Sequence, residues 1–403
     1  MMQRPLRKFV FSFGLSAMVL LAVVAIPRTP ATAQEASVIE DIRKAWMQRQ
    51  EKVKSARIEY KTRETITKGF IKKHMDELRE KDPVNVTDAV PALDVAFDST
   101  GRLLLDGVKA CWSKETQEMS WKTGKYGPLS QTVVLDGKVE KCFRKMSTGL
   151  GWDTPNGPLS HGTVSPVLKS YNLRTPPLAP LLMAFRPMVK EFQMLNLDTF
   201  KVTGRKDVLS GVSCIELATG PEGTPGARFW VDPARDYVIV RVLTVGGPKL
   251  MGRTDIRYRQ DASLGWVPES WEHIFQRGGE ALQKKSSAVV VRLEIGEPLA
   301  NSEFNLEFPP NTMVVDNVRN ETYLVKPNSE KRIVPPEDAG KSYEKLVNSQ
   351  PGEARGGPRP WPLWPWFLGA AICSAAVGLA FWWHRRTSRT ALPDSGTQTT
   401  PMI

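Results

Sequence analysis

Hydrophobic and polar residues change their spacing several times along this chain. Near the N-terminus, apolar residues recur at roughly helical spacing at Ile39, Ile42, Trp46 and Val53. Ser37 and Glu40 precede them in a capping-box pattern, which predicts an amphipathic helix that lies on a sheet. Arg49 interrupts the apolar side of this helix, so we expect its head group to reach solvent at the edge.

From Arg57 onward the spacing changes from about 3.6 residues to two, as in a half-buried strand. Ile58 and Tyr60 alternate with charged residues, and after a charged, helical stretch at 70–82 the same holds for Val95 and Phe97. Further strands are predicted around residues 102–105, 108–115, 131–136 and 138–146. Asp-Gly pairs at 106–107 and 136–137 predict the hairpin turns between them.

The middle of the chain breaks the strand pattern. Residues 147–177 are rich in Gly, Pro, Asn and Ser and predict a long loop. Residues 178–192 are strongly apolar and predict a partly helical segment, with Leu181, Leu182, Phe185 and Met188 on its apolar face. Two roles remain open for these side chains, core packing and contact with a flexible ligand.

The second half is almost entirely strand. Strands are predicted at 212–219, 227–232, 237–245, 253–260, 265–275 and 287–295. Asp232 and Pro233 predict a type I turn between the second and third of these. Val238 and Val240 alternate with other apolar residues, so their strand is apolar on both faces. Residues 289, 291, 293 and 295, all Val, Leu or Ile, are expected to share one apolar face.

About a dozen strands with short turns and only two or three helices predict a mainly β fold with helices, of the α+β class. We expect one curved antiparallel sheet that forms an incomplete barrel around the helices.

Two apolar segments at the ends of the chain predict its location. Residues 1–33 have basic residues, an apolar run and an Ala-Thr-Ala site, which is typical of a secretory signal peptide, with an uncleaved anchor as the alternative. Residues 361–383 are uncharged and flanked by tryptophans, as expected for one transmembrane helix. Arginines in the tail, 384–403, place that tail in the cytoplasm.

The chain is therefore expected to be a single-pass protein of the cytoplasmic membrane. Its main domain, residues 34–325, would be extracytoplasmic or periplasmic, joined to the span by a hairpin end and a Pro/Gly/charged linker at 326–360. Inside the span, Ala370, Ser374 and Gly378 form a small-residue stripe that would allow a homodimer.

Charge changes this interpretation little. The formal net charge is +12, but four of these charges fall in residues 1–33 and a net two after residue 383, which leaves +6 for the rest. No basic block or aromatic stripe accompanies it, so nucleic acid is not expected as a partner.

Reactive residues give no clear catalytic or metal site. Cys111, Cys142 and Cys214 precede the span, and either one disulfide between the first two or three separate thiols fits the spacing. No Cys/His spacing indicates a metal, and no cofactor is expected. His161 beside Ser160 is the sole catalytic candidate, and without an accompanying motif we expect the protein not to be an enzyme.

One hairpin carries a family resemblance. FWVDPARDYVIVRV, residues 229–242, together with the N-terminal helix and the Asp-Gly hairpins, resembles the LolA-like superfamily of periplasmic lipoprotein carriers. The resemblance implies a half-barrel that binds a lipid acyl chain or a lipoprotein without catalysis. The implied apolar site consists of Ile58, Tyr60, Val95, Phe97, Leu181, Leu182, Phe185, Met188, Val238 and Val240. An anchored domain cannot shuttle between membranes, so the alternative is an envelope sensor or interaction module similar to RseB, which acts through a protein partner.

Overall fold

The structure, a computed structural model, describes residues 33–338 and residue 346, except for short gaps. The gaps are 82–85, 121–122, 147–152, 155–156, 159, 168–171, 193–194, 210, 222–223, 247–248, 277–281 and 336–337. The described helices are α1 (Ala33–Lys52), α2 (Lys68–Lys81) and α3 (Ala179–Phe185). Short 3-10 turns lie at Asn172–Arg174, Leu197–Thr199, Pro233–Arg235 and Asn301–Phe304.

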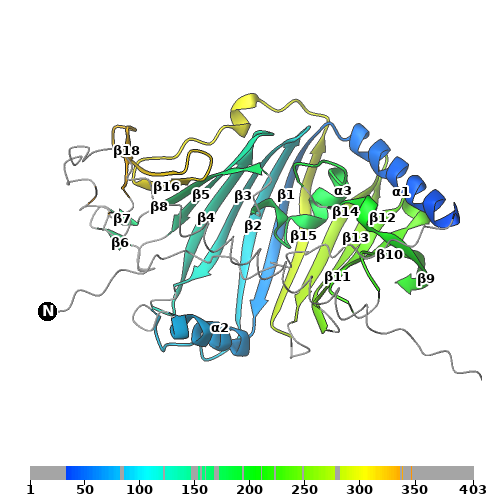
Figure 1. The fold of residues 1–403 in the computed structure, drawn as a ribbon, viewed down its shortest axis with the longest axis horizontal. Coiled ribbons are helices and arrows are strands. Elements are labelled where there is room, and N and C mark those ends of the chain that lie inside the picture. The colour runs from blue at the N-terminus through cyan, green and yellow to red at the C-terminus, as the bar shows by residue number, and fades with distance from the viewer. Residues whose placement is uncertain are drawn as a thin grey trace, which may run out of the picture. The chain divides into compact units, whose positions relative to one another are not determined.

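Sixteen strands form one open sheet, with β18 at one edge and β9 at the other (Figure 1). The order is β18-β17-β16-β8-β5-β4-β3-β2-β1-β15-β14-β13-β12-β11-β10-β9. The strands of the first half are β1 (Ser55–Ile66), β2 (Val95–Asp106), β3 (Lys109–Met119), β4 (Tyr126–Leu135), β5 (Val139–Met146) and β8 (Ser160–Pro166). Those of the second half are β9 (Lys201–Leu209), β10 (Val212–Ala218), β11 (Gly226–Asp232), β12 (Val238–Gly246), β13 (Lys249–Asp261), β14 (Gly265–Phe275) and β15 (Lys284–Ile295). The last three are β16 (Thr312–Asp316), β17 (Glu321–Val325) and β18 (Lys331–Ile333), and a separate ribbon pairs β6 (Asp153–Thr154) with β7 (Gly157–Pro158).

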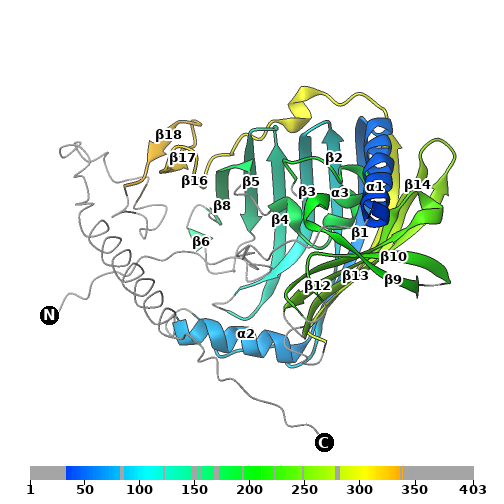
Figure 2. The same cartoon turned by 45° about the vertical axis from the view of Figure 1, so that its right-hand side comes forward.

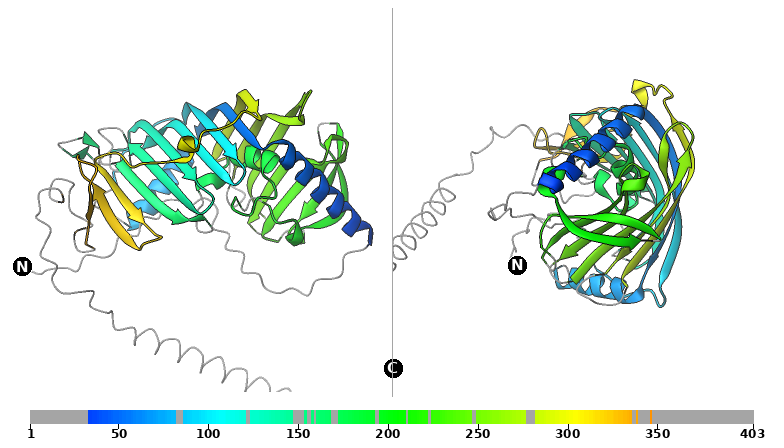
Figure 3. Two further views of the ribbon diagram at one scale, coloured as in Figure 1. Left: turned by 90° about the horizontal axis from the view of Figure 1, so that it is seen from above. Right: turned by 90° about the vertical axis from the view of Figure 1, so that its right-hand side faces the viewer.

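The sheet curves, and two helices lie on its concave face. Figure 3 shows α1 and α3 within the curve, and Figure 2 shows α2 across one end of the strands. A large sheet twists because each strand twists, and an apolar face that wraps around helices buries more surface than a flat one. The expected open half-barrel is therefore confirmed.

The N-terminal half of the sheet was predicted well because its side chains alternate. Strands β1 to β5 fall where the spacing of two residues placed them, although the alternation at Val95 and Phe97 and the predicted strand at 102–105 belong to one strand, β2. Strand β8 lies in the stretch predicted as a loop, and it pairs with β16 in parallel, whereas the prediction was antiparallel throughout. Its Gly- and Pro-rich sequence hides the strand, and its partner is far away in the chain.

A β-bulge overturns one predicted apolar face. Tyr60 pairs with Val290 and Glu59 with Arg292, so Val291 is the extra residue. The bulge exchanges the two faces of β15 at this point. Val289 and Val291 are therefore half-exposed, at 50% and 52%, while Leu293 beyond the bulge packs against the main core.

The predicted targeting segments lie outside the described residues. These are the signal peptide up to residue 32, most of the linker, the span at 361–383 with its small-residue stripe, and the tail after it. Among the described helices, none has the length and apolar composition that a membrane crossing needs.

Candidate functional site

Inward-facing side chains form rows across the concave face of the sheet. One row, from Cys142 through Val133, Trp112 and Leu103 to Ile58, is wholly buried. It belongs to one large core that continues across the sheet to Leu217 on β10 and includes side chains of α1 and α3. The interior of the half-barrel is therefore apolar over most of its width.

Helix α1 is held on this face by the turn that follows β11. The Asp232 carboxylate accepts a hydrogen bond from the Ala234 N–H at 2.9 Å and caps that turn. The chain then passes through Asp236 and Tyr237, both at positive φ. Trp46 Nε1 donates to the Tyr237 carbonyl at 2.8 Å, and the Arg49 guanidinium donates to the Asp236 carbonyl. The predicted Asp-Pro turn is thus the docking point of α1.

Arg49 does not reach solvent, contrary to the sequence-based expectation. Its residue is 8% exposed, and burial lowers the pKa of its guanidinium. A buried cation is stable here because the turn carbonyl accepts its hydrogen bond. Arg49, which interrupts the apolar side of α1, therefore forms a polar contact with the turn.

The α3 segment, residues 178–192, fills the centre of the concave face. Leu178, Leu181, Leu182 and Phe185 are each at most 2% exposed. Arg186, which is 1% exposed, holds this segment to the start of the sheet. Its Nε donates to the Gly107 carbonyl at 3.0 Å, Nη2 to the Lys54 carbonyl at 2.8 Å and Nη1 to the Phe185 carbonyl at 2.8 Å. Burial lowers the pKa of Arg186 to about 10.

The structure brings most residues of the predicted apolar site together. Residues 58, 60, 181, 182, 185 and 238 are buried in the main core, and Met188 and Val240 pack against it. Val95 belongs instead to a smaller cluster around α2, and Phe97 lies beside Tyr126, with ring centroids 6.0 Å apart. The main-core residues contact one another and the protein's own helices, so the interior is occupied by its own side chains.

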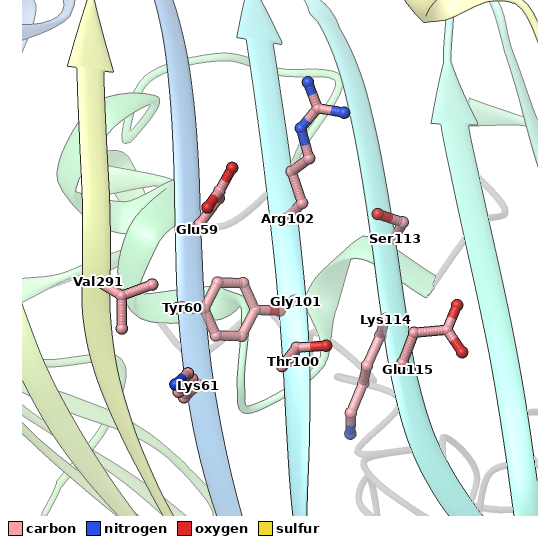
Figure 4. Close-up of a pocket in the computed structure, with 10 residues that line it drawn as sticks. All are labelled: Glu59, Tyr60, Lys61, Thr100, Gly101, Arg102, Ser113, Lys114, Glu115 and Val291. Atoms are coloured by element: carbon pink, nitrogen blue, oxygen red, sulfur yellow. The ribbon is translucent and has the colours of Figure 1, made fainter.

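Tyr60 marks the boundary of the apolar interior. Its ring crosses the neighbouring Gly101 (Figure 4), where a Cβ atom would lie 2.3 Å from Tyr60 Cζ. Trp112 Nε1 donates to the Tyr60 hydroxyl at 2.6 Å, and the Trp271 ring centroid lies 5.8 Å from that of Tyr60. Burial raises the pKa of the Tyr60 hydroxyl, so this group remains a neutral hydrogen-bonding partner.

Beyond Tyr60 the concave face becomes polar. On β1 the inward residues run Ile58, Tyr60, Thr62, Glu64 and Ile66, so two polar positions separate the main core from the cluster around α2. Equivalent positions on the adjacent strands continue this polar belt, whose members are Thr62, Glu64, Ser99, Lys114, Thr116, Thr254, His273, Lys284 and Ser286.

The polar belt is largely buried and internally bonded. Thr62, Glu64, Ser99 and Ser286 are each at most 7% exposed. The Ser99 and Thr116 hydroxyls lie 2.8 Å apart, and Lys284 Nζ lies 2.9 Å from Glu64 Oε1. Sequence reasoning missed this belt, although the alternation that identified Ile58 and Tyr60 continues through residues 62 and 64.

His273 links the polar belt to the stability of the fold at low pH. Its Nδ1 lies 2.9 Å from the Thr254 hydroxyl, and burial, together with the Lys284 charge, lowers its pKa to about 4. In the unfolded chain the His273 imidazole binds a proton near pH 6.5, whereas in the folded chain it does so only near pH 4. Proton binding therefore favours unfolding between these two values. We expect the free energy of unfolding to decrease as the pH falls from about 6.5 to about 4. Urea denaturation of His273→Gln should show a weaker decrease, and an unchanged pH dependence would contradict this assignment.

The outer face carries a depression of about 280 Å³ beside the same strands (Figure 4). Its rim includes Glu59, Lys61, Arg102 and Glu115, with Val291 as an apolar neighbour. Charges of both signs make this a polar surface, so it does not resemble a site for a hydrocarbon.

The two residues considered as a catalytic pair, Ser160 and His161, lie on opposite faces of the sheet. Ser160 and His161 are adjacent on β8 and therefore point to opposite faces of the sheet. His161 pairs with Arg144 on the neighbouring strand. Burial lowers the pKa of the His161 imidazole, and the Arg144 charge lowers it further. No group of three or more His, Cys, Asp or Glu residues in the described part of the chain could hold a metal ion.

The three cysteines among the described residues do not form a disulfide. Cys111 pairs with Val134 and Cys142 with Val133 on the strand between them, so the two thiols lie on opposite faces. Cys111, Cys142 and Cys214 are free. Burial raises the pKa of both Cys111 and Cys142 to about 11, which keeps them protonated near neutral pH.

Comparison with known proteins gives matches by structure only. No family model and no curated protein matches the chain. An outer membrane lipoprotein-sorting protein domain from Vibrio parahaemolyticus has 12% identity and a TM-score of 0.36, covering 66% of this chain and 97% of that one. A DUF1329 family protein from Desulfovibrio piger has 8% identity and a TM-score of 0.39, with 68% and 98% covered.

A LolA superfamily protein from Nitrosomonas europaea has 9% identity and a TM-score of 0.33, covering 66% of this chain and 97% of that one. All three TM-scores lie below 0.5, so the functional proposal rests on the geometry of this chain. The chain is similar in structure to proteins of the LolA superfamily and to a lipoprotein-sorting domain.

Proposed function

We propose that this protein binds the hydrocarbon tail of a lipid or lipoprotein in the apolar interior of its half-barrel, without catalysis. The observation that carries the proposal is the cover of that interior. The apolar concave face spans most of the sheet, yet only helix α1 and the short α3 segment cover it. In a β-sandwich a second sheet would cover such a face. The span predicted at 361–383 and the predicted signal would hold this domain outside the cytoplasmic membrane.

The α3 segment can leave without breaking the sheet. Its backbone hydrogen bonds are mostly internal, such as those from Leu181 and Leu182 to the Leu178 carbonyl. The side chain of Arg186 and the backbone N–H of Met188, which donates to Gln50 Oε1 at 3.3 Å, connect it to its surroundings. Displacing it therefore exchanges side-chain contacts and leaves the strand ladder in place.

The free-energy cost of exposing the α3 side chains and the gain from burying a hydrocarbon tail are of similar size. Moving Leu181, Leu182 and Phe185 into water costs about 5–9 kcal/mol, at about 1.5–3 kcal/mol each. A buried tail of about 15 methylene groups contributes about 12 kcal/mol, at about 0.8 kcal/mol per group. Releasing the Arg186 hydrogen bonds adds about 3–5 kcal/mol to this cost. A long saturated tail is therefore of the size needed to replace the α3 segment, whereas a tail of half that length, at about 6 kcal/mol, is not.

The proposal is tested by what the protein retains. Residues 33–347, which contain all strands of the sixteen-stranded sheet, are expressed in an exported form, purified without detergent and extracted with organic solvent. We expect about one lipid or acylated peptide per chain by mass spectrometry, and uptake of a fluorescent long-chain fatty acid by the extracted protein. A protein that is empty and takes up no fatty acid would contradict lipid binding.

A second function is favoured by the outer face. Val289 and Val291 lie side by side on β15 and are half-exposed, although valine is usually buried in a sheet. An empty interior in the extraction experiment would favour an interaction module that acts through this surface, as in the envelope-sensor alternative.

A further inference from the structure

One buried carboxylate, Glu64, is ion-paired with Lys284 and acts electrostatically on a second lysine of the polar belt, Lys114. Lys284 Nζ lies 2.9 Å from Glu64 Oε1, and the Glu64 side chain is 10% exposed. Lys114 enters the same belt from β3, where it is paired with Gly101 on one side and Gln131 on the other. Burial lowers the pKa of Lys114, the Lys284 charge lowers it further, and Glu64 raises it. Within the described residues, Lys114 has no ion pair of its own, so the group carries one surplus positive charge.

The surrounding polar groups do not remove this surplus. Farther along the same face, the Glu118 carboxylate accepts two hydrogen bonds of 2.8 Å from Arg144, and the Glu140 carboxylate accepts one from Asn172. His273 is neutral near pH 7, because its pKa is lowered to about 4. A sheltered cation without its own counter-ion favours an anionic ligand.

The position of Lys114 connects this charge to the apolar interior. Lys114 lies two residues from Trp112 on the same face of β3, and Trp112 belongs to the main core. A ligand whose anionic group reached the lysines would therefore have its remaining atoms beside Trp112 and Tyr60, at the edge of the interior.

We propose that Lys114 and Lys284 bind the anionic headgroup, a carboxylate or phosphate, of the lipid whose tail enters the interior. This inference rests on the proposed lipid binding and adds the class of ligand. In the empty state Glu64 compensates the charge of Lys284, and in the bound state the headgroup compensates the remaining charge of Lys114. A neutral lipid with the same tail lacks this contact and binds more weakly.

The test compares ligands that differ only in the headgroup. The full chain, held in an amphipathic polymer, is titrated with radiolabelled hexadecanoic acid and with 1-hexadecanol. We expect the acid to bind about tenfold more tightly, as one hydrogen-bonded charge pair allows. Lys114→Gln and Lys284→Gln should each remove most of this preference without changing the affinity for the alcohol. Lys114→Arg should retain the preference.

Two further variants separate the site from general charge effects. Lys285→Gln changes the neighbouring lysine, which lies on the outer face of β15 and pairs with Glu272 at 2.6 Å, so the preference should not change. Glu64→Gln removes the competing carboxylate and should strengthen binding of the acid. Circular dichroism on each variant confirms that it is folded.

The possible outcomes distinguish this inference from the proposed function. Equal affinities for acid and alcohol, or an unchanged preference in both glutamine variants, would overturn the headgroup site while leaving tail binding intact. If neither ligand binds, tail binding fails, and titration with inorganic phosphate alone then decides the anion site. A saturable rise in Tm that is absent in Lys114→Gln would support a site for free phosphate, and no rise would overturn the anion site as well.

Discussion

Arg186→Ala is expected to lower the free energy of unfolding by about 3–5 kcal/mol. The guanidinium donates to the carbonyls of Gly107, Lys54 and Phe185, and alanine supplies no donor for any of them. The Lys54 carbonyl keeps the Gly107 N–H as a donor at 3.2 Å. The Gly107 and Phe185 carbonyls lose theirs, at about 1–3 kcal/mol each, and the removed side chain also leaves a void. Urea denaturation of residues 33–347, followed by tryptophan fluorescence, measures this loss.

Arg63→Ala is the matched control for that change. Arg63 forms an ion pair with Asp98 at 3.5 Å, and its side chain is 65% exposed. An exposed ion pair contributes about 0–1 kcal/mol, so this variant should be nearly as stable as the wild type. Equal losses in the two variants would mean that Arg186 does not hold the α3 segment in the way described.

Gly101→Val is expected to lower the free energy of unfolding by about 2–4 kcal/mol. Even the first added carbon would lie 2.3 Å from Tyr60 Cζ, so the ring must move away. That movement breaks the hydrogen bond between the Tyr60 hydroxyl and Trp112 Nε1 and disturbs the contact with Trp271. The change in Tm and the loss of near-ultraviolet circular dichroism from these aromatic rings measure the effect.

Gly69→Ala separates this steric effect from a general effect of replacing glycine. Gly69 lies in α2, and no atom comes within 4 Å of a Cβ built there. Alanine in a helix is about 0.5–1 kcal/mol more favourable than glycine, so this variant should be equally or slightly more stable. A Gly101→Val protein that keeps its Tm would contradict the described packing of Tyr60.

Local alternation was sufficient to predict most of this fold. Strand β1 is readable from Ile58 and Tyr60 because the inward side chains of a half-covered strand recur every two residues. The bulge at Val291 could not be predicted, since a bulge adds one residue without changing the residue types. Strand β8 was missed for a different reason, because its stretch of the chain is rich in Gly and Pro and its parallel partner β16 is distant in the sequence.

The candidate site was predicted only as an apolar surface. Leu181, Leu182 and Phe185 were expected to form the apolar face of a helix, with core packing or ligand contact as their role. In the structure α3 is buried on all sides, and these side chains belong to the main core. The roles of Arg49 and Arg186 depend on backbone carbonyls that other segments supply, which no local pattern indicates. Whether a ligand replaces the α3 side chains stays a proposal.

The most direct test of tail binding observes the interior tryptophans. The protein is labelled with 5-fluorotryptophan, and its fluorine resonances are assigned by single substitutions and followed during titration with hexadecanoic acid. Trp112 and Trp271 are buried in the main core, whereas Trp230 belongs to the outer face, where its Nε1 donates to Asp207 at 2.7 Å. We predict that the resonances of Trp112 and Trp271 shift at saturation while that of Trp230 does not. Shifts confined to Trp230, or no saturable shift at any of the three, would contradict a hydrocarbon site beneath the α3 segment.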